Sequence, residues 1–393
     1  MHTDNTSRYP VVATTPSIQN FQGHSKIDMD TGDARTDVLD VLWLVVPWLD
    51  GPSLRTTRLA CSFAKIVVDD HVDHKTRDRT DAARMIGAPR IGLLGKTDVT
   101  RNSMDHICIA PGAWQWVTKI TLVDLNMVPG AIGQLVHLVE LVAVAGNLTD
   151  LPSEIEGLTQ LQRLCLHSNS FTEIPAVVWQ LTQLKHLDVA ANYIRVLPNE
   201  IGLLTNLRYL CLIQNPLAHL SPEIEKLTRL ENLGLAATIR GELPGVVGQL
   251  ESLRVLTVDC NRYTVFPDTI TKLSGLHTLN ISSNKLTALP DTIGRLVHLK
   301  NLSVSHNQLS VLPDEFMALT QLTRLDLYDN RFPEIPGVLM HLTQLHELYL
   351  SGNLIRDLPT WIERLSGLRA LHLENNRPRF QLPASMRNTQ LWS

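Results

Sequence analysis

Residues 276–296 read LHTLNISSNKLTALPDTIGRL, and this pattern of Leu, Asn and Pro recurs every 23 residues along most of the chain. Leu fills the first position of every copy, from Leu138 to Leu368, and again the position three residues later, from Leu141 to Leu371. The Pro position holds Pro129, Pro152, Pro175, Pro198, Pro244, Pro267, Pro290, Pro313, Pro336 and Pro359. The Asn position holds Asn169, Asn192, Asn215, Asn261, Asn284, Asn307, Asn330, Asn353 and Asn376. A fixed period of this kind indicates stacked, similar units.

Each position of the quoted copy has a physical role. Leu279 and Ile281 alternate with polar residues, which predicts a short strand with these two side chains inward. Asn284 follows, and its amide can satisfy backbone groups where the chain bends away from the strand. Pro290 then fixes φ and removes a backbone donor, so it suits a turn. The segment from Pro290 to Leu296 predicts a helical turn on the opposite side. One unit cannot bury its own apolar edge, so neighbouring units must stack.

The pattern resembles the leucine-rich repeat superfamily, and its 23-residue units are similar to the intracellular Ras-group-related class. The resemblance covers residues 116–383, about 11 units, and implies an α/β solenoid, a leucine-rich repeat horseshoe. It says little about function, because one fold serves many functions. Val123 and Gly146 stand in the first two Asn positions, which indicates an atypical N-terminal cap. Ser221 replaces one Pro, and Thr238 replaces one Asn, where we expect a local bend.

The composition excludes several classes of protein. The chain has 393 residues, 44% hydrophobic residues and a formal net charge of -4, so it lacks the basic surface of a general nucleic-acid binder. Its longest apolar run, Val41 to Leu49, is much shorter than the ~20 residues that cross a bilayer. We therefore expect no membrane insertion. Five Cys without close spacing favour a reducing, cytoplasmic setting.

No motif in the sequence predicts catalysis, a cofactor or a metal. Cys165 and Cys211 share a repeat position but lie two units apart, ~10 Å, whereas each zinc-bound sulfur lies ~2.3 Å from the metal. The segment Gly92–Thr97 is similar to a phosphate loop, but Arg90 stands where its first Gly belongs. We therefore expect a protein that is not an enzyme.

The outward strand positions predict a concave surface, with one residue per unit every ~4.8 Å along each row. Its last units carry a set that we name the late patch: Arg324, Asp326, Tyr328, Asp329, Glu347, Tyr349, His372 and Glu374. Tyr side chains suit interfaces, because they bury area with few rotatable bonds. We hypothesise that the two Tyr, with Asp326, Asp329 and Glu347, bind a target protein through a basic segment. The alternative is an ordinary solvated surface.

The residues before the repeats divide into three segments. Residues 1–36 are polar and predict a disordered tail. Residues 37–73 change to an apolar composition and predict a small helical module. Residues 74–115 predict a linker and the start of the N-terminal cap, with a short strand at Ile91 to Leu94. After the repeats, residues 384–393 predict a C-terminal tail.

The 37–73 segment resembles an F-box, the helical module whose family docks on the Skp1 adaptor of cullin-type ubiquitin ligases. The residues that carry the resemblance, and by implication bind the adaptor, are Val41, Leu42, Val45, Val46, Leu49, Leu54, Leu59, Cys61 and Phe63. Asp37-Val38 replaces the usual opening Leu-Pro, Pro47 interrupts the first helix, and Phe63 stands one residue early for the usual Trp. The alternative is a helical cap that only shields the first repeat.

Together these features predict a non-enzymatic adaptor. The concave face would select a target protein, and the F-box-like segment would present it to a ubiquitin ligase in the cytoplasm. F-box and repeat combinations also resemble effectors that bacteria or viruses deliver into eukaryotic cells, which would act in the host cytoplasm. A second hypothesis is a signalling scaffold without a ubiquitin-ligase role.

Overall fold

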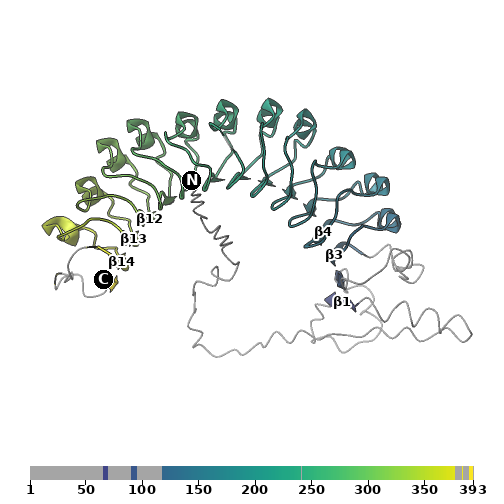
Figure 1. The fold of residues 1–393 in the computed structure, drawn as a ribbon, viewed down its shortest axis with the longest axis horizontal. Helices are drawn as coiled ribbons and strands as arrows, with labels where there is room; N and C mark the ends of the chain where they lie inside the picture. Colours follow the sequence, from purple (N-terminus) through teal and green to yellow (C-terminus); the bar gives the residue numbers. More distant parts are fainter. Residues whose placement is uncertain are drawn as a thin grey trace, which may run out of the picture. The chain divides into compact units, whose positions relative to one another are not determined.

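The computed structural model describes residues 65–69, 90–94, 117–239, 241–376, 383 and 389–392. Within these residues, 15 strands form a single sheet in which strand order follows chain order. From β3 onward the strands lie along the inner side of an arch, and short helices lie along its outer side (Figure 1). The strands therefore provide the concave surface, and the helices provide the convex one.

The strands of the repeats are three to five residues long. In chain order they are β3 Lys119–Val123, β4 Glu140–Val144, β5 Arg163–Cys165, β6 His186–Asp188, β7 Tyr209–Cys211, β8 Asn232–Gly234, β9 Val255–Thr257, β10 Thr278–Asn280, β11 Asn301–Ser303, β12 Arg324–Asp326, β13 Glu347–Tyr349 and β14 Ala370–His372. Before them come β1 Lys65–Asp69 and β2 Arg90–Leu94, and after them comes β15 Gln390–Trp392.

The helices on the outer side are all single 3-10 turns of five residues. They are η4 Gly130–Gln134, η5 Ser153–Gly157, η6 Ala176–Gln180, η7 Asn199–Leu203, η8 Pro222–Lys226, η9 Gly245–Gln249, η10 Asp268–Lys272, η11 Asp291–Arg295, η12 Asp314–Ala318, η13 Gly337–His341 and η14 Thr360–Arg364. No helix in the described ranges is long and apolar enough to cross a membrane.

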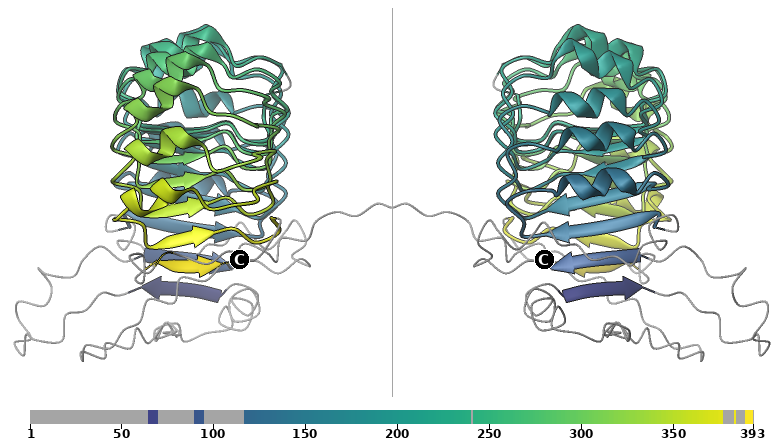
Figure 2. Two further views of the ribbon diagram at one scale, coloured as in Figure 1. Left: turned by 90° about the vertical axis from the view of Figure 1, so that its left-hand side faces the viewer. Right: turned by 90° about the vertical axis from the view of Figure 1, so that its right-hand side faces the viewer.

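The pairing of the strands keeps the 23-residue phase of the sequence. Strand β10 pairs in parallel with β11, and Thr278 lies opposite Asn301. The same offset relates every pair of neighbours from β4 to β14. Figure 2 shows these strands stacked side by side. The predicted solenoid and its period are therefore confirmed.

The core consists of columns of aliphatic side chains between the strands and the helices. In the quoted copy, Leu279 is 1% exposed, and Ile281, Leu286 and Ile293 are fully buried. The predicted helical turn is confirmed, because the Ile293 N–H donates to the Pro290 carbonyl at 3.0 Å. Each buried aliphatic side chain contributes ~1.5–3 kcal/mol relative to an exposed one, so stacking stabilises every internal unit.

The hydrogen bonds of Asn explain why this residue recurs at the same position of the repeat. The Asn284 amide donates to the carbonyls of Ile281 at 3.0 Å and Val258 at 3.2 Å. Its Oδ1 accepts the N–H of Tyr263 at 2.8 Å. The side chain thus satisfies backbone groups of its own unit and of the preceding one. This ladder confirms the predicted role of the Asn position.

The two departures from the pattern find substitute bonds. The Thr238 hydroxyl donates to the carbonyls of Leu212 at 2.9 Å and Ala236 at 2.8 Å, close to the bonds that Asn makes elsewhere. The Ser221 hydroxyl accepts the N–H of Glu223 at 3.1 Å and caps η8. Strands β8 and β9 keep the common register across Thr238. The local bend expected there stays a prediction.

Two terminal segments differ from the sequence-based expectations. The helical module expected over 37–73 includes β1, a strand antiparallel to β2, where a helix was predicted. Its Lys-Ile-Val-Val-Asp sequence is rich in β-branched residues, which favour strands. Strand β2 confirms the strand predicted at 91–94 and pairs in parallel with β3. The other residues of 37–73, including all nine expected to bind an adaptor, lie outside the described residues.

The last residues also contribute a strand where a tail was predicted. Strand β15 pairs in parallel with β14, with Leu371 opposite Leu391. The Thr389 hydroxyl donates to the Leu368 carbonyl at 2.7 Å, and the Gln390 N–H donates to the Arg369 carbonyl at 2.8 Å. A strand here pairs the backbone groups that β14 would otherwise leave free at the sheet edge.

Candidate functional site

The late patch lies on three neighbouring strands and the turns that follow them. Arg324 and Asp326 belong to β12, Glu347 and Tyr349 to β13, and His372 to β14, while Tyr328, Asp329 and Glu374 lie in the following turns. Because the strands pair in register, Asp326, Tyr349 and His372 form one row across the sheet. The structure therefore brings the predicted residues together on the concave face.

Tyr349 is the centre of the late patch. Its ring stacks on His372 at a centroid distance of 4.4 Å and an interplanar angle of 10°. Arg324, on the strand at the other side, places its guanidinium carbon 4.7 Å from the same ring. The Tyr349 hydroxyl donates to Glu347 at 2.9 Å, and Arg324 bonds the same carboxylate at 2.8 Å. Burial raises the pKa of Tyr349, so the phenol stays protonated and keeps donating.

A second contact group surrounds Tyr328. Its ring meets His306 edge-on, at 4.9 Å between centroids and 78° between planes. The His306 Nδ1 lies 2.8 Å from Asp329 Oδ2. His306 was not among the residues predicted for the late patch. The signal was available, because His306 precedes Asp329 by one 23-residue period and therefore occupies the neighbouring rung.

The remaining carboxylates are also held by hydrogen bonds. Asp326 accepts the Ser303 hydroxyl at 3.0 Å and the backbone N–H of Tyr328 at 3.0 Å. Glu374 accepts the Ser351 hydroxyl and lies 3.5 Å from His372. Burial is the largest single influence and would raise the pKa of Glu374, but the bond from Ser351, a backbone hydrogen bond and the nearby His372 together outweigh it, so the pKa falls below its ordinary value. The Glu374 carboxylate is therefore ionised at neutral pH.

The late patch carries excess negative charge that a partner can reach. It holds four carboxylates against one guanidinium. The side chains remain accessible, with 51% of Arg324, 39% of Glu347 and 59% of Asp329 exposed. Exposed ion pairs add little stability, ~0–1 kcal/mol each, so their main effect is to hold the side chains in place. The result is a preorganised acidic surface with one exposed aromatic, Tyr328, at 37%.

A different set of side chains occupies the early part of the concave face. His186 and Tyr209 stack at 4.0 Å with an interplanar angle of 8°. Nearby, the Cys165 thiol lies 3.6 Å from Asp188 Oδ2, and Cys211 is buried. We name His186, Asp188, Tyr209, Cys165 and Cys211 the early cluster.

Burial favours the uncharged forms of the thiols and the imidazole in the early cluster. Burial raises the pKa of the Cys165 thiol to about 12 and that of Cys211 to about 11. Burial also lowers the pKa of His186, which favours the neutral imidazole. Protonated thiols are poor nucleophiles and poor metal ligands. Within the described ranges, no group of three or more His, Cys, Asp or Glu is arranged to hold a metal ion.

Sequence comparison identifies the class of protein. The model of the leucine-rich repeat region matches residues 124–214, 198–289 and 268–389, which together span well over half of the chain. The chain therefore belongs to the leucine-rich repeat family. This fold generally mediates protein–protein interaction, and its members are typically non-enzymatic binding scaffolds. No curated protein matches the chain.

Solved structures resemble the solenoid over most of its length. The leucine-rich repeat protein LIC12759 of Leptospira interrogans is 28% identical, with a TM-score of 0.55, over 72% of this chain and 86% of that one. The internalin InlF of Listeria monocytogenes is 24% identical, with a TM-score of 0.59, over 71% and 87%, and shows the fold alone. The plant peptide hormone receptor RGFR1, solved in complex with RGF2, is 26% identical, with a TM-score of 0.55, over 72% and 52%. This chain thus spans about half of that receptor.

Proposed function

We propose that the late patch binds a basic segment of a partner protein, and that the chain acts through this contact as a non-enzymatic adaptor. The observation that carries the proposal is the ordered set of carboxylates around Tyr328 and Tyr349. Tyr349 is covered on its two sides by Arg324 and His372, so it anchors the surface. Tyr328 is the aromatic that remains exposed beside Asp329.

The chemistry of this surface favours a cationic ligand. A Lys or Arg from the partner would lie against the Tyr328 ring, where a cation–π contact contributes ~0.5–1 kcal/mol at an exposed site. The excess carboxylates would speed its approach through electrostatic attraction. The side chains are already held by neighbours, so binding loses little side-chain entropy. The plant peptide hormone receptor RGFR1, solved in complex with RGF2, supports peptide binding as a use of this fold.

The test compares wild type with a Tyr328→Ala/Tyr349→Ala double variant in the full chain. The probes are a fluorescein-labelled Lys/Arg-rich peptide containing Leu and its twin with Glu in place of each basic residue. We expect the basic peptide to bind and the double variant to weaken binding about tenfold or more. Tyr193→Ala is the matched control, since Tyr193 is 60% exposed and lies outside the late patch. Equal binding by wild type and the double variant would overturn the proposal.

The coupling partner is proposed from sequence resemblance. We propose that the F-box-like segment binds the Skp1 adaptor, so that the chain presents its target to a cullin-type ubiquitin ligase in the cytoplasm. Support comes from the apolar spacing of Val41, Val45 and Leu49 and from Leu54 and Cys61 beyond the turn. The alternatives are a signalling scaffold and an effector that acts in a eukaryotic host.

Co-purification with Skp1 separates the adaptor from the scaffold. We expect wild type to retain Skp1 and Val45→Asp or Leu54→Asp to lose it, because a carboxylate would be buried in an apolar contact. Thr56→Asp is the control for added charge in the same segment. Absence of binding by wild type would favour the scaffold, and it would leave the peptide result for the late patch unaffected.

A further inference from the structure

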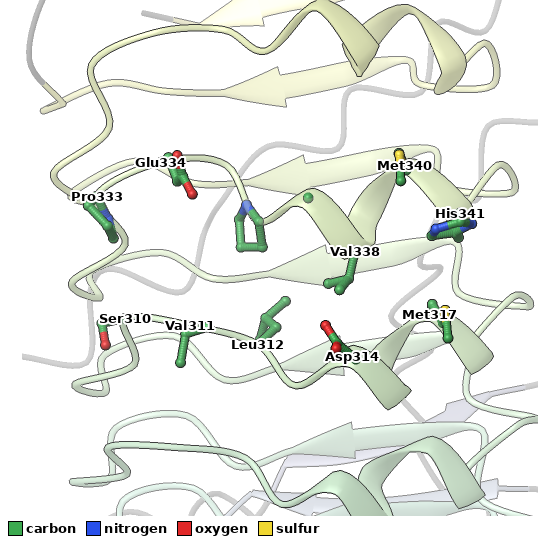
Figure 3. Close-up of a pocket in the computed structure, with 12 residues that line it drawn as sticks. Ser310, Val311, Leu312, Asp314, Met317, Pro333, Glu334, Val338, Met340 and His341 are labelled. Atoms are coloured by element: carbon green, nitrogen blue, oxygen red, sulfur yellow. The ribbon is translucent and has the colours of Figure 1, made fainter.

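A groove opens on the convex side, between the coils that carry η12 and η13. Its volume is about 530 Å³, within the range of ligand-binding clefts. One wall consists of Val311, Leu312 and Met317, and the facing wall includes Val338 and Met340. Figure 3 shows Leu312 and Val338 in the gap between the two coils, with Met317 and Met340 near the helices. The groove lies beside η12 and η13, on the outer side of the arch in Figure 1, whereas the late patch belongs to β12, β13 and β14 and the turns after them, on the inner side.

The walls of the groove expose apolar side chains. Val311 is 63% exposed and Met317 is 46% exposed. Met340 occupies the same repeat position as Met317, one period later. Flexible methionine side chains adapt to different apolar groups and are frequent at protein-binding surfaces. This pair therefore offers an adjustable contact for an inserted side chain.

The start of η13 leaves room at the groove. A Cβ added at Gly337, the first residue of η13, would meet no atom within 4 Å. Open space therefore lies next to Gly337, and a larger side chain there would enter it.

Two carboxylates at the groove lack partners. Asp314 and Glu334 are both exposed and line the groove. Neither makes a hydrogen bond or an ion pair with any described residue, whereas the carboxylates of the late patch are all engaged. The titratable His341 lies near Met340 (Figure 3). The apolar walls are thus bordered by two negative charges that nothing in the described part of the chain neutralises.

We propose that this groove docks a short segment of a second protein, which inserts an apolar side chain between Met317 and Met340 and places Lys or Arg beside Asp314 and Glu334. The negative charges of Asp314 and Glu334 favour a basic residue in the partner, and the exposed side chains of Val311 and Met317 favour an apolar one. Burying this apolar surface contributes ~25 cal/mol per Å². The site is independent of the late patch, so the chain could hold two partners at once.

Short labelled peptides test the groove in the full-length chain. Each probe carries one Leu, Met or Phe between Lys or Arg residues, with one twin in which Glu replaces the basic residues and another in which Ala replaces the apolar one. We expect the parent peptides to bind and both twins to bind about tenfold more weakly. Failure of every parent peptide to bind, or equal binding by the acidic twins, would overturn the proposal.

Substitutions locate the binding. Met317→Lys and the groove-filling Gly337→Leu should each weaken it about tenfold. Val265→Lys is the matched control for Met317→Lys, because Val265 is 76% exposed outside the groove. Asp314→Asn/Glu334→Gln should weaken binding severalfold, and Asp268→Asn/Asp291→Asn, at the starts of η10 and η11, should not. All the groove substitutions are made in the Tyr328→Ala/Tyr349→Ala background, which removes binding at the late patch. Parent-peptide binding that survives all of them would contradict the site.

A photo-cross-linker distinguishes the other occupants. With benzoylphenylalanine in place of Met317, the parent peptide should be captured, and unlabelled peptide should compete. Cross-linking within one chain, insensitive to the peptide, would show that another segment of this chain fills the groove. Cross-linking between two copies would show a dimer interface. Either result would overturn docking of a second protein.

Discussion

The early cluster and the late patch use the same pair of rings in different electrostatic settings. His186 and Tyr209 stack at 4.0 Å and 8°, and Tyr349 and His372 stack at 4.4 Å and 10°. In both cases the rings lie on adjacent strands at equivalent positions, so the spacing of the ladder produces the stack. The early pair lies beside two protonated thiols as well as Asp188, whereas the late patch holds four carboxylates and a guanidinium and no thiol.

The difference shows that the scaffold provides geometry and the neighbouring positions provide chemistry. The unit after Tyr209 carries small residues, such as Gly234 and Ala236, on and beside its strand. Burial of the Cys165 and Cys211 thiols keeps them protonated and neutral. Longer polar side chains surround the late pair and extend into solvent. We therefore expect the two ends to share a dependence on the Asn ladder and to differ in binding, salt response and pH response.

The largest expected effect is on stability, and it should be similar at the two ends. In Asn192→Ala the Phe171 N–H loses its acceptor, and the carbonyls of Leu166 and Val189 each lose one of two amide donors. In Asn330→Ala the Leu309 N–H loses its acceptor, and the carbonyls of Val304 and Leu327 each lose one of two. An orphaned buried group costs ~1–3 kcal/mol and each lost carbonyl bond adds to this, so each variant should lose about 2–4 kcal/mol in urea denaturation.

Asn301→Ala is the control for this pair, because its amide makes one long bond, 3.3 Å, to the Thr278 hydroxyl. We expect it to lose less than about 1 kcal/mol. A large loss at Asn192 with none at Asn330, or the reverse, would show that the ends do not depend on one ladder.

The second largest effect is on binding of the basic peptide, which should depend on the late patch and not on the early cluster. Tyr328→Ala should weaken binding of the basic peptide about tenfold, because it removes the exposed aromatic of the late patch. Tyr209→Ala should change it less than about twofold, since the early cluster holds one carboxylate where the late patch holds four. Fluorescence anisotropy with wild type and both variants provides the measurement. A larger loss for Tyr209→Ala would move the binding site to the early cluster.

A third effect appears at alkaline pH. Burial raises the pKa of Cys165 from the ordinary 9.0 to about 12 and that of Cys211 to about 11. The unfolded chain therefore loses these protons first, and the unfolding free energy falls as pH rises from about 9 towards 12. Chemical denaturation at several pH values should show a flatter fall in Cys165→Ala/Cys211→Ala. An unchanged slope would mean that other groups cause the alkaline loss.

The smallest effect concerns the exposed pair His306 and Asp329. Asp329→Asn should change stability by less than about 1 kcal/mol, as for other surface pairs. It should slow association of the basic peptide severalfold at low salt, and the difference should shrink at high salt, where screening acts. Stopped-flow association at two salt concentrations measures this. A deficit independent of salt would indicate a contact other than charge attraction.

Most of the solenoid could be predicted from the sequence, because the period assigns each residue a position. The inward Leu279 and Ile281, the bonds of Asn284 and the turn after Pro290 all agree with the predicted roles. The strands β1 and β15 were missed, since neither follows the 23-residue pattern and both depend on pairing with a neighbouring strand. The F-box-like assignment of 37–73 stays a prediction.

The candidate site was predicted in outline. The 23-residue spacing places Tyr349 and His372 in one row across the sheet. It did not add His306 to the predicted late patch, and it could not show that Arg324 covers the Tyr349 ring. Rotamers decide these contacts, and several rotamers are compatible with each position. The sequence analysis assigned no partners to the carboxylates, whereas the structure engages each of them with a neighbour.

The sequence by itself determined the repeat unit, its phase and which face each side chain takes. Local chemistry is sufficient for this, because alternating Leu, a bonding Asn and a turn-forming Pro act within one or two units. Only the tertiary structure decided which polar side chains pair on the concave face and where two helical coils separate on the convex one. Both depend on the fit between side chains a whole period apart, and that fit depends on their volumes, rotamers and charges together.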